Sequence, residues 1–518
     1  MTTSRRIIKN LYRDSVSLMQ LSEKIRAQKG ILQASAVMAT ENNISLLVEA
    51  GLLANSIPSR PNDLLIIIEG KDDATTRAAL DSAEAMLKTK KVDSGGDAIR
   101  CVAPRTIAMG LTEMPGANFV LISTPGEYAA AEARKALQLG LHVMVFSDNV
   151  SIEEEMLLKQ YARDHDLLVM GPDCGTAIIN GIPLGFANVV QRGDIGVVAA
   201  SGTGLQQVTS LIHRFGAGIT QAIGTGGHDL SREVGGITML QGIQALAKDK
   251  ATKVILLVSK PPSPDVMKSV LEMVAKSKKP AVVDFIGADA KSITKGNILG
   301  VKTLEDAATA AVLISQGKEM KKFPGTLPPN YRSLIKPALN QLKKSQRYIR
   351  GLFSGGTFCH ETILLLKEVL GTVYTNIPIN KGEKLPNVWK SLEHTVVDLG
   401  DDLFTQGRPH PMIDFRLRNE RMLQEANDPE TAVILMDIVL GHGSNMDPAG
   451  QLVPAVQQAQ KIAAKVKRHL IFIGSVCGTD ADPQDLSRQE SMLREAGVIL
   501  TDSNAQAARL AAAIVSKR

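Results

Sequence analysis

A glycine-rich turn in this sequence has the residue types of an anion-binding site. Ser201-Gly202-Thr203-Gly204 follows the apolar run 195–199 and precedes a helix-like stretch that begins near Leu205. Glycine lets the backbone turn tightly, and the N–H groups at a helix N-terminus favour a phosphate or a carboxylate. We therefore expect these four residues to bind a small anion.

Two further turns repeat this composition. One contains Gly224, Thr225, Gly226 and Gly227 after a short apolar segment, and the other contains Gly355, Gly356 and Thr357 after the apolar run that starts at Tyr348. The sequence predicts additional anion sites there. The alternative is that all three are ordinary strand-to-helix turns, which use Gly and Ser for backbone reasons alone.

Three side chains are candidates for catalysis. His228 adjoins the second turn, and it can donate to a phosphate oxygen or protonate a leaving nitrogen. Arg232 follows closely and offers a bidentate contact to phosphate or carboxylate. His410 follows the acidic turn 398–402 at the end of the strand expected at 395–399. The alternatives are a loop histidine, a surface salt bridge and, at the acidic turn, a structural role or a divalent cation; we assign no metal.

The composition is that of a large soluble α/β protein. The 518 residues suggest about three domains, and 44% are hydrophobic, 22% charged and only 3% aromatic. The net charge of +6 is small, and with so few aromatic side chains nucleic-acid binding is not expected. No run approaches a membrane span, so we expect a cytoplasmic protein without membrane contact.

The four cysteines, Cys101, Cys174, Cys359 and Cys477, have no spacing typical of zinc or disulfides. This favours a reducing compartment. Cys174 has no basic partner in the sequence, and we interpret it as a structural turn residue and not as a nucleophile.

Apolar runs and amphipathic stretches alternate along the chain. Strands are expected at 64–68, 119–123, 143–147, 167–170, 195–199, 254–259, 281–286, 433–439 and 470–473. Helices are expected at 127–139, 152–165 and 241–248. This rhythm predicts parallel βαβ units. We place domains at 1–190, 191–318 and 345–518, with a basic, proline-containing linker at 319–344.

The chain resembles succinyl-CoA synthetase α subunits over residues 118–311. The motifs are Met170-Gly-Pro-Asp-Cys-Gly175, Ile195-Gly-Val-Val-Ala-Ala-Ser-Gly-Thr203 and Ile223-Gly-Thr-Gly-Gly227. Over nearly its whole length it resembles the FdrA family. That resemblance rests on Asp14-Ser-Val-Ser-Leu-Met19, Phe146-Ser-Asp-Asn-Val150, Gly171-Pro-Asp-Cys-Gly-Thr176, Asp229-Leu-Ser-Arg-Glu-Val-Gly-Gly236, Val258-Ser-Lys-Pro-Pro262 and Gly407-Arg-Pro-His-Pro-Met-Ile-Asp414.

The synthetase resemblance implies a Rossmann-like CoA-binding-type domain in the first 190 residues, followed by two flavodoxin-like ligase domains, and chemistry through an acyl phosphate. The synthetases carry a phosphorylated histidine soon after the strand expected at 281–286, yet this chain has no histidine between His228 and His360. Their Gly-x-x-Gly turn for the CoA phosphates is missing from residues 6–15, and no ATP-grasp domain is evident. CoA is therefore a doubtful ligand, and we expect phosphate as a substrate.

The FdrA family also includes a component of the oxamate carbamoyltransferase of allantoin breakdown, which works with two further proteins. That enzyme cleaves oxalurate with phosphate to oxamate and carbamoyl phosphate. The resemblance thus implies a carbamoyltransferase component in purine catabolism, acting on a ureide or an acyl phosphate, with two partner subunits or a homo-oligomer. An ADP-forming acyl-CoA synthetase and a non-catalytic scaffold subunit are the alternatives.

Overall fold

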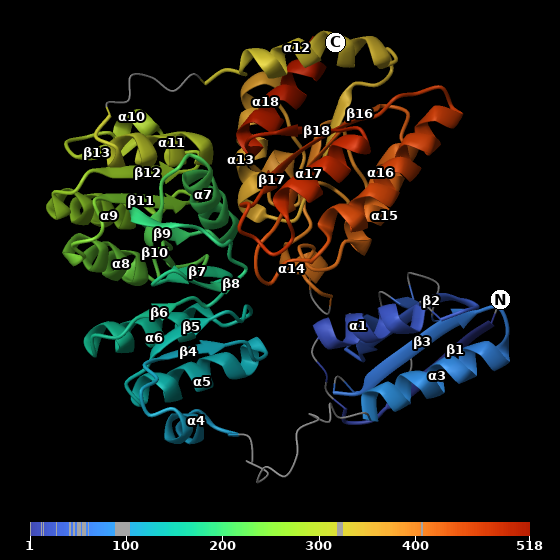
Figure 1. Cartoon of the computed structure of the whole chain (residues 1–518), viewed down its shortest axis with the longest axis horizontal. Coiled ribbons are helices and arrows are strands. Elements are labelled where there is room, and N and C mark those ends of the chain that lie inside the picture. Colours follow the sequence, from blue (N-terminus) through green and yellow to red (C-terminus); the bar gives the residue numbers. More distant parts are fainter. Residues whose placement is uncertain are drawn as a thin grey trace. The chain divides into compact units, whose positions relative to one another are not determined.

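The computed structural model describes residues 2–11, 13, 15–26, 28–40, 43–44, 47–48, 53, 59–60, 62–88, 104–318, 325–405 and 408–517. Its contacts divide the chain into two units (Figure 1). Unit 1 consists of Met1–Ala103 and Asp401–Pro411, and unit 2 of Pro104–Gly400 and Met412–Arg518.

Unit 1 has an antiparallel sheet in the order β1-β3-β2. Its elements are β1 (Thr2–Ile8), α1 (Ser15–Arg26), β2 (Ile31–Met38), β3 (Leu64–Gly70), α3 (Asp73–Lys88) and the short α14 (Asp402–Thr405). The strand expected at 64–68 is confirmed, but its parallel pairing is wrong. Leu64, Ile66 and Ile68 pack in one apolar cluster, and Leu65 and Ile67 in another. A strand covered on both faces gives the same continuous apolar run in either kind of sheet.

Unit 2 begins with a parallel three-stranded sheet in the order β4-β5-β6. The strands are β4 (Phe119–Ile122), β5 (His142–Val145) and β6 (Val169–Met170), and the helices are α4 (Ile107–Glu113), α5 (Gly126–Gln138) and α6 (Ile152–Asp164). The strands and helices expected here are confirmed. Ser151 and Glu154 form a capping box that fixes the start of α6.

A seven-stranded sheet follows, in the order β13-β12-β11-β9-β10-β7-β8. Its strands are β7 (Thr176–Ile179), β8 (Ile182–Gly185), β9 (Arg192–Ala200), β10 (Ile219–Gly224), β11 (Val254–Ser259), β12 (Ala281–Phe285) and β13 (Ile298–Gly300). Its helices are α7 (Gly202–Arg214), α8 (Ile237–Lys248), α9 (Pro264–Ser277), α10 (Ala290–Ile293) and α11 (Leu304–Ser315). Only the β7–β8 hairpin is antiparallel to its neighbours in this sheet.

The fully parallel last sheet has the order β15-β14-β16-β17-β18. The strands are β14 (Tyr348–Phe353), β15 (Thr395–Asp398), β16 (Thr431–Val439), β17 (Ile471–Cys477) and β18 (Val498–Thr501). The helices are α12 (Pro329–Gln341), α13 (Gly356–Leu370), η1 (Lys381–Glu383), α15 (Arg416–Asn427), α16 (Pro448–Lys465), α17 (Leu486–Glu495) and α18 (Asn504–Val515).

The segment expected to be a linker contains the helix α12. Its residues Tyr331, Ile335 and Ala338 are buried, and the Tyr331 hydroxyl accepts a hydrogen bond from the Asp502 N–H at 3.0 Å. Residues 319–324 lie outside the described part of the chain. Residues 329–341 are therefore a packed element of unit 2, and the expected boundaries at 190 and 318 stay predictions.

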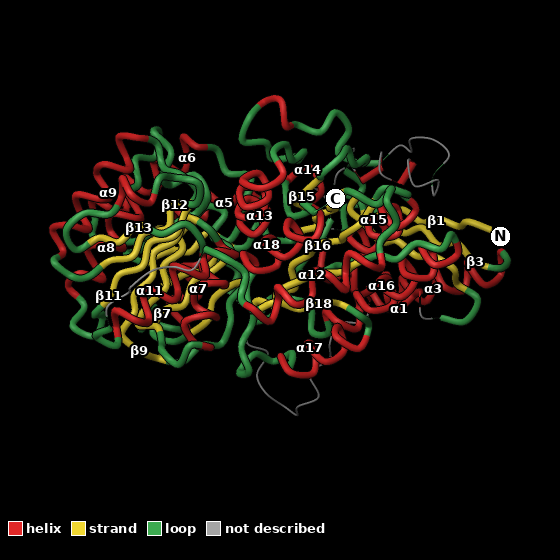
Figure 2. Tube along the Cα trace, turned by 90° about the horizontal axis from the view of Figure 1, so that it is seen from above, coloured by secondary structure: helices red, strands yellow, loops and turns green. Residues whose placement is uncertain are grey.

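Helices cover both faces of the seven-stranded sheet (Figure 2). Apolar residues of α8 and α9 pack on one face, and residues of α7 and α11 pack on the other. The second group shares its core with α13 and α18 of the last sheet. This shared core brings the first turns of α7 and α13 together: the Ser201 and Thr357 hydroxyls are 2.5 Å apart.

Candidate functional site

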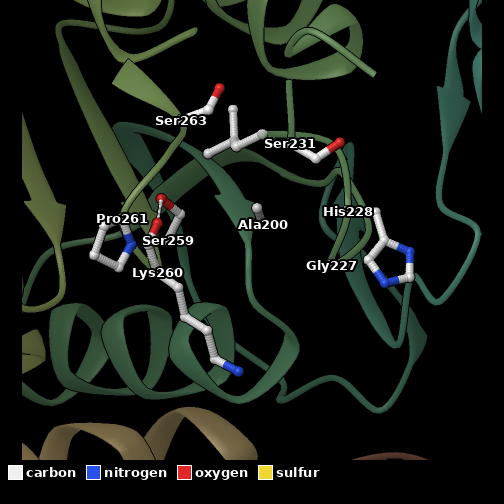
Figure 3. A pocket seen from close by; sticks show the side chains of 9 residues that line it. Ala200, Gly227, His228, Ser231, Ser259, Lys260, Pro261 and Ser263 are labelled. Atoms are coloured by element: carbon white, nitrogen blue, oxygen red, sulfur yellow. Dashed lines mark hydrogen bonds between the residues drawn. The ribbon is translucent and has the colours of Figure 1, made fainter. Parts of the chain in front are cut away.

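A cavity of about 220 Å³ opens at the carboxyl ends of β9 and β11 (Figure 3). The chain runs from β9 to β10 on one side and then to β11 on the other, so the connections diverge at this point of the sheet. Such a switch point is where open α/β sheets bind ligands. Two strand ends and two connections line the cavity. The lining includes Ala200 at the end of β9 and Ser259 at the end of β11, with Lys260 directly after it, and Gly227, His228 and Ser231 after β10.

The first predicted turn lies beside this cavity at a helix N-terminus, as expected. Ser201 is the N-cap of α7, and its hydroxyl accepts a hydrogen bond from the Gly204 N–H at 3.0 Å. A Cβ atom at Gly204 would lie 2.4 Å from that hydroxyl, so this cap requires glycine. Within the described residues, the N–H groups of Gly202 and Thr203 have no acceptor. These donors suit an anion, and anion binding at Ser201–Gly204 stays a prediction.

The second predicted turn, at Gly224, Thr225, Gly226 and Gly227, is not followed by a helix start. The next helix, α8, begins only at Ile237. Its first N–H groups are already bonded, because the Asp229 carboxylate accepts from Thr238 at 3.1 Å and from Met239 at 2.9 Å. The interpretation of this turn as the entry to a helix is therefore wrong.

Close packing explains the glycines of the second turn. A Cβ atom at Gly224 would lie 2.3 Å from the Thr176 carbonyl oxygen, and one at Gly226 would lie 2.2 Å from that of Pro172. Thr225 is fully buried and donates its N–H to the Ala199 carbonyl. Gly227 and His228 are the residues of this stretch that reach the cavity.

The third predicted turn is at a helix N-terminus, and a carboxylate of the chain binds the residues that lead into this helix. Asp437 accepts from the Ser354 N–H at 2.8 Å, the Ser354 hydroxyl at 2.9 Å and the Gly355 N–H at 2.8 Å. Asp437 is also paired with the fully buried Arg418 at 2.9 Å. A Cβ atom at Gly356 would lie 2.6 Å from Asp398 Oδ2. Gly355 and Gly356 are thus engaged within the protein, while Thr357 contacts Ser201.

Lys260 is a cavity residue that the sequence analysis did not select. It is exposed, and no group of the described chain is bonded to its ammonium. Its charge and, more strongly, burial lower the pKa of His360 on α13 to about 4. His228 and Lys260 flank Ala200 from opposite sides (Figure 3). The position directly after a parallel strand, in Val258-Ser-Lys-Pro-Pro262, was the available signal.

Of the three predicted catalytic residues, the structure places His228 at the cavity. His228 lines the cavity, with 58% of its side chain exposed. Arg232 is not among the lining residues; its guanidinium lies 3.6 Å from Asp265, and both side chains are exposed. His410 belongs to unit 1 and is not placed relative to the cavity, and Gly407 lies outside the described residues. Catalysis by all three stays a prediction.

The described cysteines are buried and free. Burial raises the pKa of the Cys174 thiol to about 12, and it also raises the pKa values of Cys359 and Cys477. A thiol held protonated is a poor nucleophile, which agrees with a structural Cys174. Cys101 lies outside the described residues. In the described part of the chain, no three His, Cys, Asp or Glu side chains are placed to hold a metal.

The parallel sheets define an α/β protein, and family models match two of its segments to domains that concern CoA. The family model "CoA binding domain" matches residues 190–287, "CoA-ligase" matches 352–514, and "AllF, heavy metal-associated domain" matches 1–100. The CoA-binding match thus falls on the segment where we expected the first ligase domain.

Proteins with similar sequences indicate the family to which this chain belongs. "Uncharacterized protein YahF" of Escherichia coli is 44% identical over 509 residues, covering 98% of each chain. The α subunit of the ADP-forming succinate–CoA ligase of Aquifex aeolicus is 29% identical over 28% of this chain and 48% of its own length. The chain belongs to the FdrA family, with YahF as a full-length relative.

A solved structure, the dinucleotide-forming acetyl-coenzyme A synthetase 1 of Ca. Korarchaeum cryptofilum, matches with 15% identity and a TM-score of 0.29, covering 77% of this chain and 82% of that one. A TM-score of 0.29 is too low to show a shared overall fold. No described helix is long and apolar enough to cross a membrane.

The family model that matches residues 1–100 is described as a heavy metal-associated domain, so we asked whether unit 1 has the ligands for a heavy metal. The first hundred residues contain no cysteine and no histidine, which are the usual ligands of soft metals. The described residues between β1 and α1 are Lys9, Asn10, Leu11 and Arg13. This donor set does not fit a soft metal ion, and we derive no function from one.

Proposed function

We propose that this protein is a component of a carbamoyltransferase that cleaves oxalurate with phosphate, giving oxamate and carbamoyl phosphate. The observation that carries the proposal is the small cavity at the switch point. Its lining includes His228 and Lys260, whose ammonium has no partner in the described chain, beside Ala200, Ser259 and Ser231. The N-terminus of α7, with the free N–H groups of Gly202 and Thr203, follows Ala200 in the chain. A pocket of this kind suits two small anions better than a large cofactor.

The reaction requires the two anions to be held in line. A phosphate oxygen attacks the ureido carbonyl carbon of oxalurate, the bond from that carbon to the oxamate nitrogen breaks, and this nitrogen takes up a proton. Gly202 and Thr203 N–H groups and the Lys260 ammonium are suited to bind phosphate and the developing oxyanion. His228, at the opposite side of the cavity, is suited to protonate the leaving nitrogen.

The chain offers no histidine for a covalent phosphate carrier in the usual place. Residues 281–318, which begin with β12, contain none. Carbamoyl phosphate forms directly from phosphate in the proposed reaction, so such a carrier is not needed. This favours phosphorolysis over a relay through phosphohistidine.

An ADP-forming acyl-CoA ligase is the alternative, and the CoA-binding and CoA-ligase family matches favour it. Two observations near β4 and β5 count against CoA at the starts of α5 and α6. The Asp148 backbone approaches Gly126 closely, since a Cβ atom there would lie 2.2 Å from the Asp148 carbonyl oxygen. The start of α6 carries the Ser151–Glu154 capping box, which places a carboxylate where a diphosphate would have to bind.

The deciding experiment measures carbamoyl phosphate formed from oxalurate and phosphate, by the chain alone and with its two expected partner proteins. We expect product only when phosphate is present. Lys260→Met should lower the rate roughly tenfold or more, because one charge-assisted contact contributes about 1.5–3 kcal/mol.

Lys253→Met is the matched control, because Lys253 is exposed and pairs with Asp194 away from the cavity lining. Formation of ADP and an acyl-CoA from ATP, CoA and a short acid, without phosphorolysis, would establish the ligase instead. Full activity of Lys260→Met would point to a scaffold role for this cavity.

A further inference from the structure

A cluster of buried charged side chains lies next to His228. The Lys159 ammonium donates to Glu155 Oε1 at 2.6 Å, to Asp229 Oδ1 at 2.8 Å and to the Thr225 carbonyl oxygen at 2.9 Å. The side chains of Glu155, Lys159 and Asp229 are all 0% exposed. This group joins α6 to the connection after β10.

The charges of this group do not balance. Two carboxylates face one ammonium; Asp229 also accepts from the Thr238 and Met239 N–H groups, whereas Glu155, within the described residues, accepts only from Lys159. Glu155 Oε2 is buried and has no hydrogen-bond partner, and His228 Nδ1 lies 3.6 Å from it, within ion-pair range. An uncompensated buried charge is costly, and a protonated His228 would compensate it.

We propose that Glu155 is a positioning residue that holds His228 as an imidazolium at the edge of the cavity, where it contacts an anionic group of the substrate. Only the identity of that substrate rests on the proposed function. Lys260 also lines the cavity, on the other side of Ala200 from His228, and is a second cationic side chain of this lining (Figure 3).

The local electrostatics agree with the geometry. The Glu155 carboxylate is the largest influence on His228 and raises its pKa above the ordinary 6.5, and Asp173 raises it further. Partial burial and the Lys159 charge oppose them. Because the pKa is raised, the imidazolium persists to higher pH than in a free histidine and is lost as the pH rises through the raised value.

The exposure of His228 argues that it does more than neutralise Glu155. A purely structural counter-ion would be buried with its carboxylate, as Lys159 is. Instead 58% of the His228 side chain is exposed, and the residue lines the cavity. One side of the ring is thus held by the protein while the rest is open to a ligand.

The test is an NMR titration of the full chain labelled with ¹³C-histidine, in which His228→Asn identifies the His228 signal among nine histidines. We expect a pKa above 6.5 in the wild type and a clear decrease in Glu155→Gln. Asp173→Asn is the control and should lower the value less. A wild-type value at or below 6.5 would overturn the proposal even if Glu155→Gln failed to fold.

Binding of sulfate, whose charge is constant from pH 5.5 to 8.5, tests the contact itself. The dissociation constant should increase as His228 deprotonates, and it should be roughly tenfold higher in His228→Asn at pH 6. Unchanged sulfate affinity in His228→Asn would contradict the contact. Neither measurement needs turnover, so a failure of the phosphorolysis assay would be a separate result.

Discussion

Replacing Asp437 by Asn should destabilise the module built on the five-stranded sheet by about 3–5 kcal/mol, the usual cost of breaking a buried ion pair. Asp437 is 1% exposed and accepts two hydrogen bonds from Ser354 and one from Gly355. Its partner Arg418 is fully buried, and two of its nitrogens, Nε and Nη2, have no hydrogen-bond partner. Without the carboxylate, Arg418 keeps only the Asp437 carbonyl and the Phe415 ring, whose centroid is 4.5 Å away.

The fluorescence of Trp389 reports on this module, because Trp389 is the single tryptophan and lies between α13 and β15 in the sequence. Its fluorescence during urea unfolding should show a midpoint lower by about 1.5–2.5 M, taking an m-value of about 2 kcal/mol/M. Glu490→Gln is the control. It breaks an exposed ion pair with Arg494 and should cost at most about 0.5 kcal/mol.

A double-mutant cycle with Arg418→Met isolates the pair. The double variant should be less destabilised than the sum of the two single variants, with a coupling of about 1–3 kcal/mol. Two results would contradict this account of Asp437. One is that the two effects add within about 0.5 kcal/mol. The other is that Asp437→Asn costs no more stability than the Glu490→Gln control.

Three further predictions follow from particular contacts. Gly226→Ala should destabilise unit 2 in thermal unfolding, because φ is +87° and the new Cβ would lie 2.2 Å from the Pro172 carbonyl oxygen; an unchanged Tm would contradict this. Ser201→Ala should cost about 1 kcal/mol through loss of the α7 cap, seen as a lower midpoint in urea. Burial raises the pKa of Glu361 to about 7 from 4.5, so the native state keeps a proton that the unfolded chain loses. Raising the pH from 4.5 to 7 therefore removes roughly 3 kcal/mol of the wild-type free energy of unfolding. The free energy of unfolding of Glu361→Gln, taken relative to wild type, should rise over that interval and stay constant above it.

Local sequence patterns predicted most elements of unit 2 well. Continuous apolar runs correctly located β9, β11 and β16, because strands of a parallel sheet are buried on both faces. The same pattern predicted the wrong strand orientation for β3. Both faces of β3 are covered by apolar clusters, although its sheet is antiparallel. Orientation depends on the partner strands, and an apolar run carries no information about them.

The candidate site was only partly predictable, for a related reason. The composition of a turn shows that its backbone can bind an anion, but it does not show which anion is already there. Asp437 reaches the N-terminus of α13 from more than 80 residues further along the chain, and no local signal announces it. Lys260 was missed although it directly follows a predicted parallel strand, because its relation to His228 depends on the strand order.

The two largest sheets share one local arrangement of parallel strands. β9 lies between β10 and β11, and β14 lies between β15 and β16, so in each case one strand is flanked by the next two strands along the chain. Each therefore has a helix N-terminus at its switch point. At α7 the N–H groups of Gly202 and Thr203 lack an acceptor in the described chain. At α13 the chain supplies a carboxylate, Asp437, to the Ser354 and Gly355 N–H groups that precede the helix. The Ser201–Thr357 contact joins the two helix starts, so the Asp437 contacts that fix the start of α13 also support the start of α7.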